Sequence, residues 1–143
     1  MEVRTEIDIE ASEDRIWEVL TNFEDFPNWN PFITRLSGTP EVGEKFEVTI
    51  HPPDSNPMTF KPTCEEAVPG KQLRWLGTVI LPRIFDGEHI FEIEDKGDGT
   101  SRFIQRENFR GILVPFMRKM LNNNTRRGFE AMNQALKDKC ESK

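Results

Sequence analysis

Two residues that can exchange a proton, His89 and Glu107, lie in neighbouring segments of alternating polarity. In residues 85–95 and 100–110 the even positions are mostly charged, and the mostly apolar odd positions hold His89, Phe91, Ile93, Phe103, Gln105, Glu107 and Phe109. Successive side chains of a β-strand point to opposite faces, so the odd positions are expected to share one buried face. An imidazole beside a carboxylate on that face could anchor a ligand or transfer protons as a general acid and base.

The loop between the two segments decides whether His89 and Glu107 meet. A three-residue loop, 97–99, places His89 opposite Glu107, whereas a two-residue loop would pair odd positions with even ones. The longer loop also sets Glu94 opposite Arg102, a favourable pair of charges. The sequence therefore predicts an imidazole and a carboxylate as cross-strand neighbours on the buried face.

Three roles are open for this pair. A buried carboxylate is costly unless it is paired, so we expect a hydrogen bond between His89 and Glu107, with Gln105 on the diagonal from His89. Buried polar groups usually have structural partners, and a purely structural pair is the first interpretation. The alternatives are a polar anchor for a ligand and a pair of catalytic residues in an enzyme.

Further residues are candidates for contact with a ligand. Trp29 could close a pocket as a lid, since aromatic side chains line many ligand sites. The methionines of the C-terminal segment would form an adaptable wall. Ordinary packing in the core is the alternative for the apolar candidates. The full set of candidate ligand-binding residues is Trp29, Met58, Phe60, Trp75, Gly77, His89, Phe91, Phe103, Gln105, Glu107, Phe109, Met117, Met120 and Asn124.

The rest of the chain predicts the elements that position these residues. Residues 2–10 alternate as a half-buried strand, and Ser12 caps a helix. Residues 23–32, with four aromatic residues and two prolines, indicate a second short helix and a tight loop. Six more segments have the pattern of strands: 33–37, 45–51, 58–68, 72–80, 85–95 and 100–110.

A long helix is predicted from Leu113 to Lys139, where the apolar period becomes 3.6 residues. Its stripe comprises Phe116, Met117, Met120, Leu121, Phe129, Met132 and Leu136. Pro115 fits its first turn, and Gly128 within it suggests close packing by a neighbour. The order of elements indicates one domain over residues 1–143, of the α+β class, with an antiparallel sheet and segregated helices.

The composition excludes several classes of function. The 143 residues carry a net charge of -6, which disfavours nucleic acid and anionic membranes as partners. The basic residues 118, 119, 126 and 127 are interpreted as a solvated helix face. Cys64 and Cys140 form no CxxC pair, and no apolar segment resembles a signal peptide or a membrane span, so we expect a cytoplasmic protein with reduced thiols. With two histidines and no phosphate-binding loop, no metal or cofactor is expected.

Six short motifs, in order along the chain, resemble the START-like, or SRPBCC, superfamily. They are Ala11 to Leu20 (Ala-Ser-x-x-x-Ile-Trp-x-Val-Leu), Phe26-Pro-x-Trp-Asn-Pro31, Pro69-Gly-Lys71, Trp75-x-Gly77, Gly87-Glu-His-x-Phe91 and Gln105-x-Glu-x-Phe-x-Gly111. The resemblance is greatest to the polyketide cyclase/dehydrase and lipid-transport branch. It implies the helix-grip fold: a seven-stranded curved antiparallel sheet wrapped around a long C-terminal helix, with two short helices after the first strand.

The resemblance also implies a cavity for a hydrophobic ligand that is lipid-, quinone- or polyketide-like. We expect a binding protein without catalysis, as a monomer or weak dimer, with the pocket between the sheet and the helix 115–139. One alternative is a cyclase or dehydratase that uses His89 and Glu107 as catalytic residues. The other is a protein-interaction module that resembles activators of the Hsp90 ATPase, because one fold serves many functions.

Overall fold

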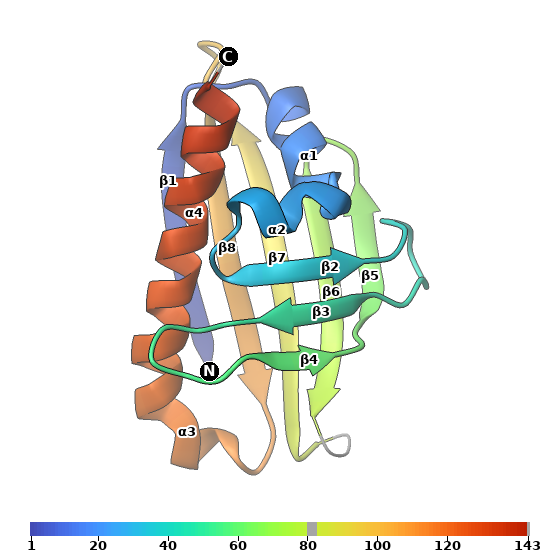
Figure 1. Cartoon of the computed structure of the whole chain (residues 1–143), viewed down its shortest axis with the longest axis vertical. Helices are drawn as coiled ribbons and strands as arrows, with labels where there is room; N and C mark the ends of the chain where they lie inside the picture. The colour runs from blue at the N-terminus through green and yellow to red at the C-terminus, as the bar shows by residue number, and fades with distance from the viewer. Residues whose placement is uncertain (80–82, 143) are drawn as a thin grey trace.

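The computed structural model describes residues 1–79 and 83–142 (Figure 1). Its strands are β1 (Glu2–Ile9), β2 (Ile33–Ser37), β3 (Glu47–Ile50), β4 (Met58–Phe60), β5 (Thr63–Val68), β6 (Gln72–Val79), β7 (Phe85–Asp95) and β8 (Ser101–Arg110). Its helices are α1 (Glu13–Thr21), α2 (Phe26–Trp29), α3 (Val114–Met120) and α4 (Arg126–Glu141), with a 3₁₀ turn at Phe23–Asp25 and a π-helical turn at Leu121–Thr125. The predicted strand 72–80 corresponds to β6, and its last residue, Ile80, lies outside the described residues.

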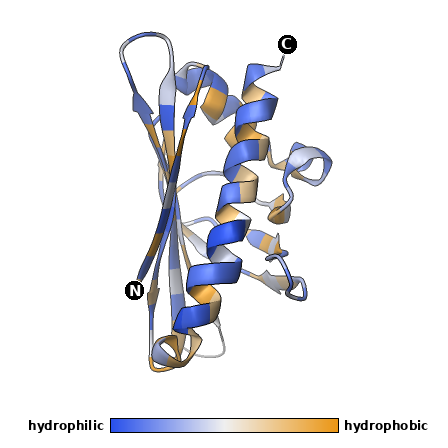
Figure 2. Ribbon diagram, turned by 90° about the vertical axis from the view of Figure 1, so that its left-hand side faces the viewer, coloured by the Kyte–Doolittle hydropathy of each residue, from blue (hydrophilic) through white to orange (hydrophobic). Residues whose placement is uncertain are grey.

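The molecule has two layers, as the edge-on view of Figure 2 shows. One layer is a five-stranded antiparallel sheet in the order β1-β8-β7-β6-β5. The other consists of α4, which packs on β1 and β8, and beside it a three-stranded sheet in the order β2-β3-β4. The short helices α1 and α2 cover one end (Figure 1). The predicted α+β helix-grip architecture is confirmed.

The number of strands differs from the prediction of seven. Eight strands are present in the described part of the chain, because the predicted strand 58–68 is split at Lys61 and Pro62 into β4 and β5. Proline has no backbone N–H to donate to a sheet ladder. At this point the chain leaves the small sheet and enters the large one. The curved sheet is therefore two sheets that face each other across the core.

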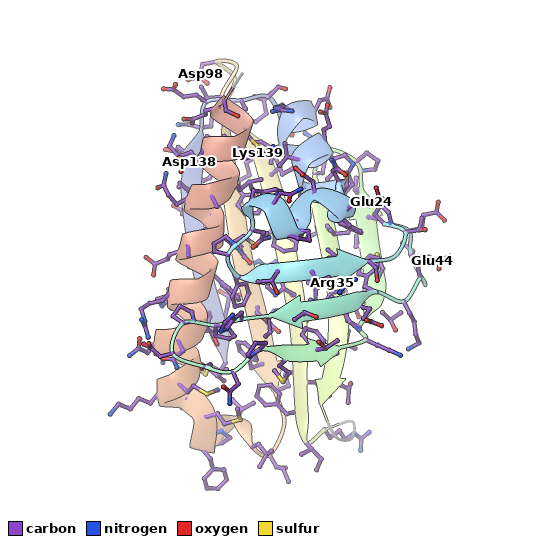
Figure 3. All side chains as sticks on the ribbon, in the orientation of Figure 1. Glu24, Arg35, Glu44, Asp98, Asp138 and Lys139 are labelled. Atoms are coloured by element: carbon purple, nitrogen blue, oxygen red, sulfur yellow. The ribbon has the colours of Figure 1, made fainter. Side chains whose placement is uncertain are left out.

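The core lies between the two layers, and the residues that form it follow the alternation of apolar and polar residues in the sequence. Residues of β1 alternate between exposed and buried, with Val3 and Ile9 fully buried. Ser12 caps α1 by accepting a hydrogen bond from the backbone N–H of Arg15 at 3.2 Å. The expected close packing at Gly128 is confirmed, because a Cβ atom there would overlap the ring of Phe32. The charged side chains of Glu24, Arg35 and Glu44, which are labelled in Figure 3, are exposed.

The long C-terminal helix predicted for residues 113–139 is confirmed: the chain is helical from Val114 to Glu141, with a π-helical turn that the sequence pattern did not predict. The π-helical turn separates α3 from α4 and changes the direction in which side chains project. Phe116, which we predicted on the buried stripe, is 85% exposed, whereas Phe129 in α4 is fully buried. Pro115 lies in the first turn of α3, as expected. Among the described residues, no helix is long and apolar enough to cross a membrane.

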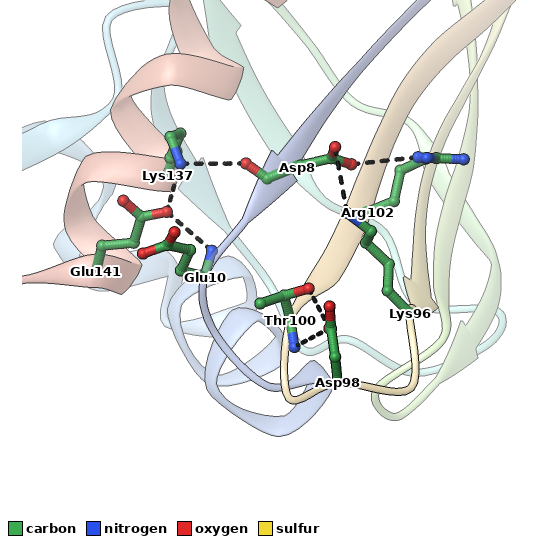
Figure 4. A network of polar contacts seen from close by, with 8 residues as sticks. All are labelled: Asp8, Glu10, Lys96, Asp98, Thr100, Arg102, Lys137 and Glu141. Carbon is green, nitrogen blue, oxygen red and sulfur yellow. Dashed lines mark hydrogen bonds and ion pairs between the residues drawn. The ribbon is translucent and has the colours of Figure 1, made fainter.

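A polar network fastens the end of α4 to the edge of the large sheet (Figure 4). The carboxylate of Asp8 in β1 accepts a hydrogen bond from Arg102 Nε in β8 at 3.3 Å. Lys137 in α4 donates to the backbone carbonyl of Asp8 at 3.2 Å, and Glu141 accepts from the backbone N–H of Glu10 at 2.8 Å. These contacts fix the helix against β1 at the end of the molecule opposite α3.

Candidate functional site

An apolar pocket of about 100 Å³ lies near the α3 end of the molecule. The large sheet contributes Trp75, Gly77, Phe85, Gly87, His89, Glu107 and Phe109; the small sheet and its flanks contribute Phe32, Ile50, Pro52, Met58 and Phe60; α3 and the π-helical turn contribute Met117, Met120, Leu121 and Thr125. We expected the pocket between the sheet and the helix 115–139, and the first part of this helix does line it. In the structure α4 provides none of the lining, because its apolar face packs into the core.

The structure brings most of the candidate residues together around this pocket. Nine of the fourteen line it: Met58, Phe60, Trp75, Gly77, His89, Glu107, Phe109, Met117 and Met120. The other five lie elsewhere: Trp29, Phe91, Phe103, Gln105 and Asn124.

Phe91 and Phe103 belong to the core rather than to the pocket. Their rings stack with centroids 5.8 Å apart, and both side chains are at most 1% exposed. Both rings belong to the buried core cluster that also includes Phe129 of α4. Gln105 is also fully buried and lies behind His89, where it forms hydrogen bonds instead of lining the cavity.

Trp29 and Asn124 lie outside the pocket lining. Trp29 packs edge-on against Phe26, with ring centroids 5.2 Å apart, so it follows the alternative of ordinary core packing and does not line this pocket. Asn124 lies in the π-helical turn, and its side-chain amide donates to Ser55 Oγ at 3.2 Å. It therefore fastens the loop before β4 to the helix.

Two glycines create space at the base of the pocket. Gly77 in β6 and Gly87 in β7 are directly paired across the sheet. A Cβ atom on Gly77 would approach the ring of Phe60 to 3.1 Å, and one on Gly87 would overlap the carboxylate of Glu107. Side chains at these two positions would fill the cavity, so the glycine pair determines its depth.

The predicted pairing of His89 with Glu107 is confirmed. The two residues are opposite each other in the β7–β8 ladder, and His89 Nδ1 lies 2.9 Å from Glu107 Oε1. The same register sets Glu94 opposite Arg102, as predicted. The imidazole stacks on Trp75 at a centroid distance of 5.1 Å.

A chain of hydrogen bonds continues from His89 into the core. His89 Nε2 lies 3.0 Å from Gln105 Oε1, and Gln105 Nε2 donates to Asn133 Oδ1 in α4 at 2.8 Å. Asn133 Nδ2 donates to Thr5 Oγ1 in β1 at 2.9 Å. The pair at the pocket is thus the end of a buried polar chain that runs from the large sheet to α4 and back to β1 of the same sheet.

Sequence reasoning missed Gly87 and Asn133. Gly87 is the first residue of one of the quoted motifs, but its role depends on the β6–β7 register. The sequence between those strands does not define the length of their loop, so this register could not be predicted. Asn133 had a signal that we did not use: it is a polar residue between Met132 and Leu136, which lie on the apolar stripe of the helix. A buried amide on such a stripe requires partners from another element.

The two cysteines are free, buried and outside the pocket lining. Burial raises the pKa of the Cys140 thiol to about 11. Burial also raises the pKa of the Cys64 thiol. A thiol with a raised pKa carries little thiolate at neutral pH, so neither residue is suited to nucleophilic catalysis.

The family of proteins described as polyketide cyclase/dehydrase and lipid transport matches residues 1–141 of this chain. By sequence, no curated protein is similar enough to this chain to count as a relative.

Solved structures with low sequence identity share the fold. The Zhui aromatase/cyclase from Streptomyces sp. R1128 is 13% identical with a TM-score of 0.79, and the match covers 99% of this chain and 93% of that one. A START superfamily protein from Mycobacterium smegmatis is 17% identical with a TM-score of 0.77, covering 98% and 97%. Norcoclaurine synthase from Thalictrum flavum, solved with dopamine and hydroxybenzaldehyde, is 15% identical with a TM-score of 0.72, covering 100% and 89%.

Proposed function

Because this chain belongs to the polyketide cyclase/dehydrase and lipid-transport family of START-like proteins, we propose that it binds a small hydrophobic molecule without transforming it. The observation that supports this most is the apolar pocket whose base is left open by Gly77 and Gly87. Apolar surface gains roughly 25 cal/mol per Å² when it leaves water, which favours an apolar occupant.

The size of the pocket limits what it holds. Sites for drug-sized ligands measure roughly 300–1,000 Å³, whereas this cavity measures about 100 Å³, a volume that favours the protein-interaction module over a binder of drug-sized ligands. An apolar cavity of roughly 150 Å³ is sufficient for benzene. This cavity is smaller than that, so it encloses only part of a ring-sized group, and the rest of a ligand would extend past Met58 and Met120, which are 43% and 41% exposed.

An enzymatic function is the second candidate, and the hydrogen bond between His89 and Glu107 at the pocket favours it. Such a pair could transfer a proton in a cyclase or dehydratase reaction. Two of the similar structures are named as an aromatase/cyclase and a synthase. Native mass spectrometry of freshly purified protein separates the two candidates. A protein that only binds its ligand holds a molecule whose mass is the same before and after binding, whereas an enzyme changes the mass or structure of its substrate.

The pocket can be tested with toluene, a single apolar ring, by NMR of protein labelled with ¹³C at the methionine methyl groups. Toluene should shift the signals of Met58, Met117 and Met120, which line the pocket. The signal of Met132, which is fully buried in the core, should remain unchanged. Gly77→Leu should weaken binding by about tenfold or more, because the new side chain fills the cavity and removes apolar contact.

Thr78→Leu provides the matched control, since it adds the same side chain to the next residue of β6, on the exposed face. It should leave the binding of toluene unchanged. Equal affinity of toluene for the wild type and a folded Gly77→Leu variant would show that the pocket has been assigned to the wrong place. Failure of toluene to shift any pocket methionine would favour the protein-interaction module instead.

The cellular location is also part of the proposal. The two free, buried thiols support a cytoplasmic protein, because disulfides are rare in that compartment.

A further inference from the structure

The polarity of the buried hydrogen-bond chain is determined at its inner end. Thr5 Oγ1 lies 2.9 Å from the backbone carbonyl oxygen of Gln105, which can only accept, so the single hydroxyl hydrogen of Thr5 points there. The same hydroxyl must therefore accept from Asn133, whose Nδ2 lies 2.9 Å away. Asn133 then presents its carbonyl oxygen to Gln105 Nε2 at 2.8 Å.

The polarity continues to the imidazole. Gln105 uses its amide nitrogen toward Asn133 and toward the backbone carbonyl of Phe129 at 3.4 Å. Its carbonyl oxygen is consequently the atom that faces His89 Nε2 at 3.0 Å, and Nε2 must carry a hydrogen. Reversing either amide would place two donors or two acceptors in contact, at a cost typical of unsatisfied buried groups.

The contact between His89 and Glu107 then holds one shared proton. With Nε2 protonated, Nδ1 either carries the second hydrogen of an imidazolium or offers a lone pair. At 2.9 Å a lone pair cannot face a bare carboxylate without repulsion, so the proton lies on the line between Nδ1 and Oε1 in either form. Both arrangements leave the pair without net charge, which suits an apolar pocket.

The second oxygen of Glu107 is thus an acceptor in both forms, because the shared proton is on the Oε1 side. This oxygen lies over Gly87, where a Cβ atom would overlap it. Glu107 lines the pocket, and its side chain is 15% exposed. Thr125 is another polar residue of the lining. Its hydroxyl can both donate and accept, so it favours neither donors nor acceptors on a ligand.

We propose that the pocket selects neutral ligands whose apolar body carries a hydrogen-bond donor, a hydroxyl or N–H group, and that Glu107 Oε2 accepts this hydrogen bond. Molecules that carry only acceptors, such as ketones and quinones, meet a lone pair at this position. The inference rests on the proposed function, because it names the class of ligand for the same pocket. The direction of the hydrogen bonds, which is fixed at Thr5, thus determines which class of ligand the pocket binds.

The test compares cyclohexanol with cyclohexanone, which share one ring and differ in the hydrogen-bond donor. Both are titrated into protein labelled at the methionine methyl groups, with toluene as the reference ligand. In the wild type, cyclohexanol should bind about ten- to a hundredfold more tightly, the usual value of a hydrogen bond to a charged group. In Glu107→Met, which replaces the acceptor by an apolar group of similar length, the ratio of affinities should fall to about one.

The outcomes separate the two proposals. If toluene binds but cyclohexanone binds as tightly as cyclohexanol in the wild type, the preference for donors is wrong and the binding function stands. If none of the three binds, the binding function itself is wrong, and the preference is lost with it.

A second measurement does not depend on the variant folding. ¹⁵N NMR of the His89 ring should show a hydrogen on Nε2 throughout, with the exposed ring of His51 as the internal comparison. A neutral ring with its hydrogen on Nδ1 would overturn the polarity and the inference drawn from it.

Discussion

The imidazole of His89 is surrounded by aromatic rings. It stacks on Trp75, and its centroid lies 4.6 Å from that of Phe91 and 5.0 Å from that of Phe129. These rings exclude water from one side of the hydrogen bond to Glu107. A polar contact in such surroundings is strong when complete and costly when one partner is missing.

A double-mutant cycle measures this coupling. His89→Phe and Glu107→Met should each lower the free energy of unfolding by about 1–3 kcal/mol, because each leaves a buried polar group unpaired. The double variant should cost less than the sum of the two, since neither polar group then remains. Urea denaturation followed by circular dichroism gives the values.

The control for this cycle combines His89→Phe with Glu24→Met. Glu24 is exposed near α2 (Figure 3), so these two changes should be additive. Additive costs for the His89 and Glu107 pair as well would mean that the two side chains do not interact.

For single residues, the sequence was sufficient to predict the contact between His89 and Glu107 but not the contacts of Asn133. The first pair follows from the alternation of two strands and the length of one loop, which are local properties. Asn133 reaches Gln105 only because α4 is rotated over β8 in one particular way. That rotation depends on how all the side chains of the core fit together, which a pattern of apolar residues does not specify.

Among the elements, the contact of β1 with β8 depends partly on charge. The guanidinium of Arg102, followed by the ammonium of Lys96, lowers the pKa of the Asp8 carboxyl below its ordinary value of 3.8. A carboxyl with a lowered pKa in the folded protein stabilises the fold above the pKa of the unfolded chain. This stabilisation is lost as the pH falls through the folded value.

Asp8→Asn should therefore lower the urea midpoint near neutral pH, and the difference from the wild type should vanish well below pH 3.8. High salt should also reduce the difference, because the carboxyl is exposed and its ion pairs are screened. A difference that is the same at both pH values would show that the charge of Asp8 has no part in it.

Local patterns predicted most element boundaries and failed at two places. The division of residues 58–68 into β4 and β5 depends on which sheet each half joins, although Pro62 offered a hint. The π-helical turn has no clear sequence signal, since Leu121–Thr125 has no proline or glycine. In both cases the long-range arrangement overrides the local preference.

For the molecule as a whole, the two layers protect both thiols. Cys64 is 1% exposed in β5, and Cys140 is 6% exposed in the last turns of α4. Iodoacetamide should react slowly with the native protein near neutral pH, because burial raises both thiol pKa values and blocks access. After denaturation, protein extracted from cells should show two free thiols, and a Cys64–Cys140 disulfide would contradict the cytoplasmic assignment.

The π-helical turn determines which side chains of α3 face the pocket, so inserting or deleting one residue there would change the pocket wall. A π-helical turn is in effect an α-helix with one inserted residue, and each residue rotates a helix by about 100°. Deleting one residue within Leu121–Thr125 would restore an unbroken helix and rotate α3 relative to α4, moving Met117 and Met120 away from the cavity. The core face of α4 would be unaffected. The side chains that face a ligand can therefore be exchanged by a single insertion or deletion, without any substitution in the wall itself.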